Sequence, residues 1–130
     1  MPHVELQISG EPDPRLTREA AATVAELTQR ILGKRPEVIA VAVRYLSRDA
    51  WFIGGESLAT LGKNAFHLEI SITDETNTKA EKARFLGELF RTLADRIGNV
   101  HPVSYIHVID ARAAAYGYGG QTQEFRAQHP

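Results

Sequence analysis

The sequence contains no cysteine, which excludes disulfides, thiolate catalysis and cysteine-ligated metals. This composition suits a reducing compartment, and we expect a cytoplasmic protein. No apolar run approaches the roughly 18–20 residues of a membrane span, so no membrane contact is expected. The net charge of −1 shows no excess of either sign that would favour nucleic acid. The five histidines form no helical i,i+4 pair, so we expect no metal site.

What is present is sufficient for one folded domain. The 130 residues are 43% hydrophobic and 24% charged, which is ordinary for a globular protein with a hydrophobic core. We therefore expect a single domain over residues 1–130.

The most informative feature is an internal repeat. His3–Ser9 reads HVELQIS and His67–Thr73 reads HLEISIT, so that apolar and polar positions match one for one. The alternation predicts two equivalent strands, each with one buried face. The copies differ at their start, where Pro2 precedes the first and Phe66 precedes the second.

An amphipathic helix follows the first strand in each half. In the first half, Asp13 is the expected N-cap, Pro14 the first helical residue and Gly33 the left-handed residue after the helix. In the second half, residues 78–81 (TKAE) form a capping-box pattern, and Gly98 closes the helix. The stripes predicted to face the core are Leu16, Ala20, Val24, Leu27 and Ile31 in one helix and Leu86, Leu89, Phe90, Leu93 and Ile97 in the other.

Each helix leads into a second apolar strand and then into a glycine pair. The strands are expected over Val38–Tyr45 and Val103–Asp110. The glycine pairs follow aromatic residues, in Trp51–Gly55 (WFIGG) and Tyr116–Gly120 (YGYGG). Their apolar residues suit edge pairing between subunits.

This order predicts an α/β (α+β) fold of two tandem βαβ units. Repeat one covers residues 2–62, repeat two covers residues 65–121, and a polar tail covers residues 122–130. The four strands form one sheet with two helices on one face. The other face, which carries His3, Glu5, Gln7 and Ser9, is left open, and we expect identical subunits to cover it.

These features together resemble the tautomerase superfamily. Its members begin with proline after the initiator methionine, and they consist of one βαβ unit or of two fused units. Tyr116–Gly120 is similar to the family's aromatic–glycine segment, and Trp51–Gly55 is similar with one glycine replaced. The resemblance is to the fused, 4-oxalocrotonate tautomerase-like and 5-carboxymethyl-2-hydroxymuconate isomerase-like members. It implies a tautomerase/MIF-like fold and a homotrimer with sites built across subunit contacts.

The resemblance implies that Pro2 is catalytic. Once Met1 is removed, Pro2 becomes a free secondary amine, and its ring aims the lone pair. An α-amino group has a reference pKa of about 8, and burial or a nearby arginine lowers it toward neutrality. The expected activity is a keto–enol tautomerase/isomerase acting on a small 2-oxo or 2-hydroxy unsaturated acid, with Pro2 as general base. No metal or organic cofactor is implied.

The resemblance also implies arginines that bind the substrate carboxylate, and here the sequence departs from the family. The positions that match the family's arginines hold Glu11, Glu75, Ala40 and Tyr105. Another arginine must then bind the substrate carboxylate. The candidates are Arg44, Arg112 and Arg15.

Four further residues are expected at the pocket. Trp51 and Tyr116 stand at the aromatic position that walls the pocket in the family. Tyr105 and His107 share a strand face from which they can donate hydrogen bonds to an oxyanion.

A second interpretation stays open. βαβ–βαβ is also the order of elements in ferredoxin-like domains. The chain is then a non-catalytic oligomeric module of ferredoxin-like or tautomerase-like fold that binds small molecules, and Pro2 only permits methionine excision or protects a sheet edge.

Overall fold

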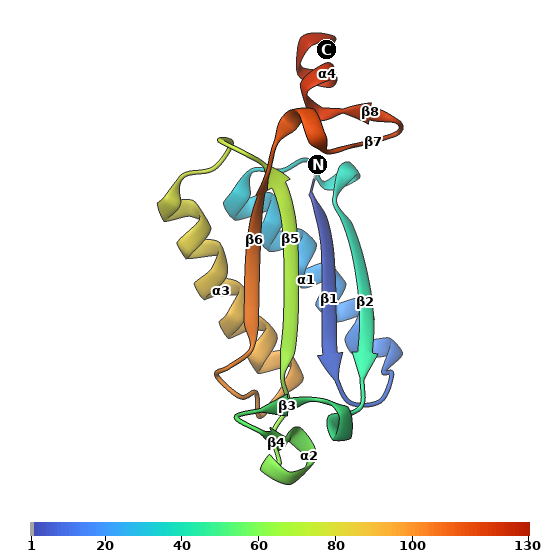
Figure 1. Cartoon of the computed structure of the whole chain (residues 1–130), viewed down its shortest axis with the longest axis vertical. Coiled ribbons are helices and arrows are strands. Elements are labelled where there is room, and N and C mark those ends of the chain that lie inside the picture. Colours follow the sequence, from blue (N-terminus) through green and yellow to red (C-terminus); the bar gives the residue numbers. More distant parts are fainter. Residues whose placement is uncertain (1) are drawn as a thin grey trace.

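Four long strands form one mixed sheet in the computed structural model, which describes residues 2–130 (Figure 1). They are β1 (His3–Ser9), β2 (Ala40–Leu46), β5 (Phe66–Thr73) and β6 (Tyr105–Ala111), in the order β2-β1-β5-β6. Within each repeat the two strands are parallel neighbours, and β1 and β5 pair antiparallel at the centre. The expected removal of Met1 concerns a residue outside those described.

This strand order decides between the two topologies. In a ferredoxin-like split βαβ unit, another strand separates the two parallel strands. Here β1 bonds directly to β2, and β5 bonds directly to β6. Each repeat is therefore a closed βαβ unit, as expected for two tandem copies, and the ferredoxin-like alternative is wrong.

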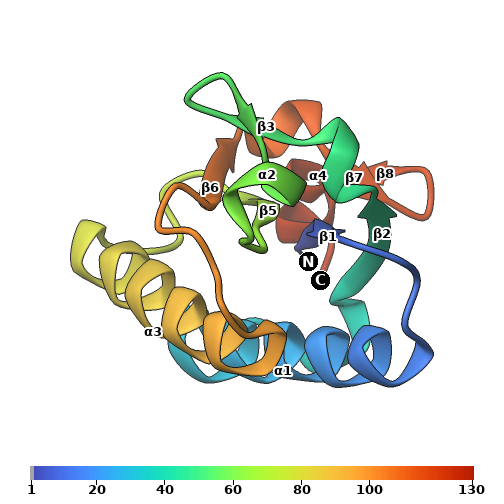
Figure 2. The ribbon, with the colours of Figure 1, turned by 90° about the horizontal axis from the view of Figure 1, so that it is seen from below.

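Helices α1 (Pro14–Leu32) and α3 (Lys79–Ile97) lie side by side on one face of the sheet (Figure 2). The predicted caps are confirmed. The Asp13 side chain accepts hydrogen bonds from the first turn of α1, and the Thr78–Glu81 capping box closes in both directions. Gly33, at a φ of 70°, ends α1 in the left-handed conformation that glycine adopts without strain.

The core lies between the helices and the sheet, where Val4, Leu6 and Ile8 of β1 meet the alternate residues of β5. The stripe predicted for α1 is confirmed. In α3, Leu89 and Leu93 are buried as expected, but Leu86 is 41% exposed, and the buried position of that turn is Phe85.

The open face carries the polar side chains of β1, as predicted, except at Ser9. Ser9 is buried because its hydroxyl accepts a hydrogen bond from the backbone N–H of Ala65 over 2.9 Å. Residues 2–130 include no helix long and apolar enough to cross a membrane. No group of acidic or histidine side chains in the same residues is arranged to hold a metal ion.

Each glycine segment folds into a small hairpin. After β2 come the 3-10 helix η2 (Arg48–Ala50), β3 (Phe52–Ile53), β4 (Glu56–Ser57) and α2 (Leu58–Leu61). After β6 come η3 (Ala113–Ala115), β7 (Gly117–Tyr118), β8 (Gln121–Thr122) and α4 (Gln123–Gln128), so most of the polar tail is helical. The hairpins lie at opposite ends of the sheet, and each is close to the start of the other repeat's first strand (Figure 1).

Candidate functional site

Pro2 is buried and lines a cavity of about 370 Å³ at the end of the sheet where β1 and β2 begin. The cavity combines three segments that are far apart in sequence. It is lined by Pro2, His3, Glu37, Val38, Ile39, Ala40, Gly117 and Tyr118.

The strand register fixes Pro2 at this position. The Pro2 carbonyl accepts a hydrogen bond from the Ala40 N–H over 3.1 Å, one step before the His3–Ala40 pair that opens the parallel ladder. The 3-10 helix η1 (Pro36–Val38) then places Val38 beside the proline. Aliphatic side chains of this kind disfavour the charged form of an amine relative to its neutral form.

The second hairpin supplies the opposite wall. Gly117 and Tyr118 of β7 face the cavity, so repeat two covers the proline of repeat one. A side chain at Gly117 is excluded, because an added Cβ would overlap the carbonyl oxygen of Gln121. Phe52 holds the corresponding place in the first hairpin and is 61% exposed.

Tyr116 fastens this hairpin to the sheet. Its hydroxyl donates a hydrogen bond to the Ser71 carbonyl over 2.8 Å, and Ser71 is the β5 partner of His3. Burial raises the pKa of Tyr116 to about 12, so its hydroxyl stays a neutral donor at physiological pH. Tyr116 is not among the residues that line the cavity, whereas Tyr118 is, so a wall role for Tyr116 stays a prediction.

The charged side chains at the cavity are mostly paired. His3 lies 3.5 Å from Glu5, and Glu37 lies 3.6 Å from Arg35. Among residues 2–130, no arginine lines the cavity. One arginine of α4, Arg126, lies over the ring of Tyr118 with its guanidinium carbon 3.9 Å from the ring centroid.

The predicted arginines lie elsewhere in the single chain. Arg44 is exposed on β2, 3.9 Å from Glu5. It is four residues along β2 from Ala40, which is about 13 Å at the rise of a strand. Arg112 lines a separate surface pocket with three acidic residues. Arg15 lies on the exposed surface of α1, where it pairs with Glu19.

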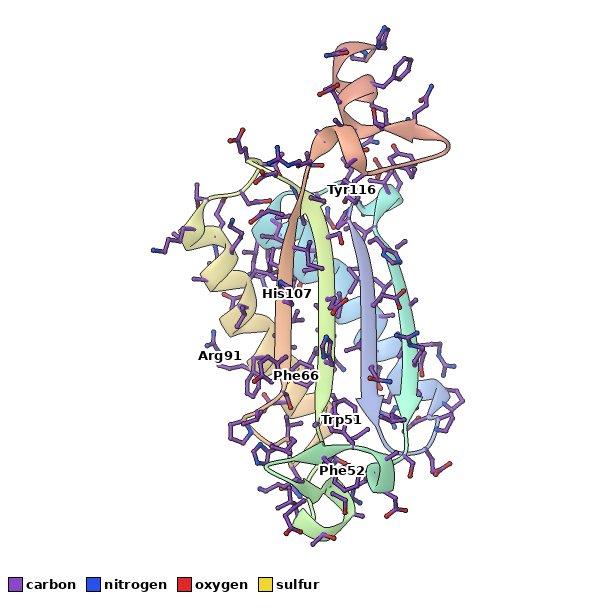
Figure 3. All side chains as sticks on the ribbon, viewed as in Figure 1. Trp51, Phe52, Phe66, Arg91, His107 and Tyr116 are labelled. Carbon is purple, nitrogen blue, oxygen red and sulfur yellow. The ribbon has the colours of Figure 1, made fainter. Side chains whose placement is uncertain are left out.

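The remaining predicted residues also lie away from Pro2 (Figure 3). Trp51 is at the opposite end of the sheet, beside the first hairpin. Tyr105 and His107 are exposed on the open face of β6, where they pair in register with His67 and Glu69 of β5. A role for these residues at a site built across subunit contacts stays a prediction.

Solved structures with the same architecture identify the fold. The Q0 fused 4-OT, a wild-type symmetric trimer, aligns with a TM-score of 0.81 at 11% identity, over 94% of this chain and 96% of that one. Pt0534 inactivated by 2-oxo-3-pentynoate aligns with a TM-score of 0.83 at 12% identity, over 95% and 98%. The chain has the tautomerase-superfamily fold.

A macrophage migration inhibitory factor-like protein from Entamoeba histolytica shares this tautomerase fold, with a TM-score of 0.76 at 16% identity, over 93% of this chain and 97% of that one. No protein-family model matches the chain, and neither does any curated protein. The expected fold is confirmed.

Sequence reasoning missed two residues that line this cavity, and an arginine that stacks on one of them. Val38 was expected to begin a strand, but it lies in η1 and lines the same cavity as the proline. For Tyr118 the sequence predicts only a place in the glycine segment, not a place in the cavity wall. Arg126 lies in the polar tail, where no periodicity or motif marks it.

Proposed function

We propose that this protein is a cofactor-independent keto–enol tautomerase that acts on a small 2-oxo or 2-hydroxy unsaturated acid, with the nitrogen of Pro2 as general base after removal of Met1. The observation that carries the proposal is the burial of Pro2 in the wall of a largely aliphatic and aromatic cavity. A proline that only protected a sheet edge would not need a cavity beside it.

The chemistry follows from the position of Pro2. A neutral secondary amine takes a proton from the enol hydroxyl or from the carbon next to the carbonyl, and the electron pair passes into the conjugated enolate. The protonated amine then returns the proton to another carbon of the same system. The substrate is an isomer of the product, so no oxidant, reductant or cofactor enters the balance.

The class of substrate is suggested by the volume of the cavity and by a solved structure that shares the fold. A cavity of about 370 Å³ is at the lower end of the range for small-molecule sites, so it suits a small acid. Pt0534, which shares the fold, is inactivated by 2-oxo-3-pentynoate, itself a small 2-oxo acid. We propose the same class for this chain.

We also propose a homotrimer. The Q0 and F6 fused 4-OT proteins are trimers, and in this chain α1 and α3 both lie on one face of the sheet, so that neither covers the other face. Subunit contacts are the proposed route by which Arg44 or another exposed arginine reaches a neighbour's cavity. Sedimentation equilibrium tests this directly, because a monomer would contradict it.

The function is tested by ketonisation of phenylenolpyruvate. Intact mass first establishes that Met1 is absent from the sample. Pro2→Ala should then lower kcat by about 10²–10⁴-fold, the usual contribution of a positioned general base. The matched control is Pro12→Ala, which changes an exposed proline before α1 and should leave kcat unchanged.

The non-catalytic alternative is favoured by one observation: within the described part of a single chain, no arginine lines the cavity. It predicts that the wild-type protein and Pro2→Ala ketonise phenylenolpyruvate at the same rate as buffer. Binding of a 2-oxo acid without turnover would then leave a small-molecule-binding module as the function.

A further inference from the structure

We propose that Arg126 is a positioning residue of the Pro2 cavity, which holds the Tyr118 ring as the cavity wall and places an unpaired positive charge behind it, so that the cavity selects anionic ligands. This inference rests on the proposed function for the identity of the substrate. The contacts and the charge of Arg126, however, do not depend on turnover.

Two contacts join Arg126 to Tyr118. The guanidinium stacks on the ring, with its central carbon 3.9 Å from the ring centroid, and Nη2 donates a hydrogen bond to the Tyr118 carbonyl over 3.0 Å. One side chain therefore holds both the ring and the backbone of the same residue. A planar guanidinium does this well, because it can stack and donate in its plane at once.

The position of Arg126 is fixed by α4 and by the turn of the second hairpin. Thr122 caps α4 by accepting a hydrogen bond from the Phe125 N–H over 3.0 Å. At Gly119, with a φ of 61°, an added Cβ would lie 2.8 Å from Nη2 of Arg126. The glycine of this turn thus leaves the space that the guanidinium needs.

The charge of Arg126 is not neutralised by an acidic side chain. None of the ion pairs among residues 2–130 includes it. Its Nε is buried and has no hydrogen-bond partner in that part of the chain. A buried donor without a partner costs roughly 1–3 kcal/mol, so its retention next to a cavity points to a role there.

The other groups around Pro2 do not supply this charge. On β1, His3 lies beside Glu5, and on η1, Glu37 lies beside Arg35. On the second hairpin, Tyr116 is neutral because its pKa is raised to about 12 by burial. Arg126 is therefore the unpaired cation among these groups, and it disfavours protonation of the proline nitrogen.

The test compares Arg126→Gln, Arg126→Lys and the wild-type protein, with Arg91→Gln as the matched control. Arg91 is exposed on α3, away from the proline cavity (Figure 3), and its replacement makes the same change in net charge. Circular dichroism shows which variants fold. If Arg126→Gln fails to fold, Arg126→Lys and Tyr118→Leu replace it. Arg126→Lys keeps the charge and loses the stacking, whereas Tyr118→Leu removes the ring.

The expected result is a shift in binding and titration with little change in chemistry. In Arg126→Gln, KM for phenylenolpyruvate should rise about 5-fold while kcat stays within about 3-fold, because Arg126 does not line the cavity and its charge acts on the ligand only through the Tyr118 wall. The pKa of Pro2, followed by NMR of labelled proline, should rise by about half a unit. Arg126→Lys should restore the titration, because it keeps the charge.

Two outcomes separate this inference from the proposed function. An active wild-type protein whose Pro2 titration and KM are the same in Arg126→Gln and Arg91→Gln overturns the inference and leaves the function standing. A wild-type protein that ketonises nothing, but whose Pro2 titration moves in Arg126→Gln and not in Arg91→Gln, overturns the function and supports the charged wall.

Discussion

The Tyr116 hydroxyl donates a hydrogen bond to the Ser71 carbonyl over 2.8 Å, and this bond ties the hairpin of repeat two to the central strand β5. The same end of the sheet holds Pro2, so the bond keeps the cavity wall in register with the proline. Burial raises the pKa of Tyr116 to about 12 in the folded chain.

This relationship predicts a loss of stability at high pH. A tyrosine with a raised pKa releases its proton in the unfolded chain near pH 10 and in the folded chain near pH 12. Its contribution to stability is therefore complete below pH 10 and is lost between pH 10 and pH 12. Tyr116→Phe should lower the free energy of unfolding by about 1 kcal/mol at pH 8, the net worth of a hydrogen bond.

Urea titrations at pH 8 and pH 11 measure this difference. Between the two pH values the wild-type protein should lose more stability than Tyr116→Phe, because the variant lacks the titrating group. An equal loss in both proteins would show that burial does not raise the pKa of Tyr116 in the folded chain.

Two neighbours in α3 should respond very differently to truncation. Phe85 is fully buried and Leu86 is 41% exposed. Phe85→Ala removes a large core side chain and should cost about 3–5 kcal/mol, whereas Leu86→Ala should cost less than about 1 kcal/mol. Thermal denaturation of both variants measures these losses of stability. Equal losses would contradict the burial of Phe85 in place of Leu86.

The error at Leu86 shows where sequence periodicity reaches its limit. Both Phe85 and Leu86 are apolar, and spacings of three and four fit either of them to Leu89 and Leu93. The rotation of a helix on its sheet is set by packing against the other helix, here α1, which no local pattern reports. The caps were easier to predict, because Asp13 and Thr78 act within their own first turn.

The candidate site was predictable only in part, for a similar reason. Pro2 is predicted from the family resemblance, and the second aromatic–glycine segment from its place in the repeat. The meeting of η1, β7 and the start of β1 depends on which end of the sheet each hairpin reaches. Arg126 had no signal at all, since a lone arginine in a polar tail looks like any exposed charge.

The capping box of α3 predicts an acid-dependent part of the stability. The backbone N–H of Thr78 and the side chain of Asn77 bond to the Glu81 carboxylate and lower its pKa. The stability from a lowered carboxyl pKa is present above pH 4.5 and is lost as pH falls through the folded value. The advantage of the wild-type protein over Glu81→Gln should therefore shrink between pH 7 and pH 3.

Thr78→Ala provides the companion measurement, because it removes the other half of the box. It should cost about 1 kcal/mol at pH 7, the usual value for an N-cap threonine. A stability difference between the wild-type protein and Glu81→Gln that stays constant from pH 7 to pH 3 would argue against the carboxylate's part in the box.

Glu5 and Glu69 stand directly opposite each other where β1 and β5 pair, at the centre of the open face. Directly opposed residues have Cβ atoms about 5 Å apart, and like charges at that spacing destabilise a sheet. Each carboxylate also has a histidine of its own strand nearby. His3 lies 3.5 Å from Glu5, and His67 lies 3.2 Å from Glu69.

Replacement of one carboxylate should therefore relieve a repulsion between the two glutamates. Glu69→Gln should stabilise the protein by a few tenths of a kcal/mol, up to about 1, because like charges directly opposite each other destabilise a sheet. Because Glu69 also lies 3.2 Å from His67, the same replacement is made in the His67→Gln background, where this contact is already lost. Urea titrations of the wild-type protein, the two single variants and the double variant at one pH measure both effects. If Glu69→Gln destabilises the protein in both backgrounds, the opposed carboxylates do not set the electrostatics of this face.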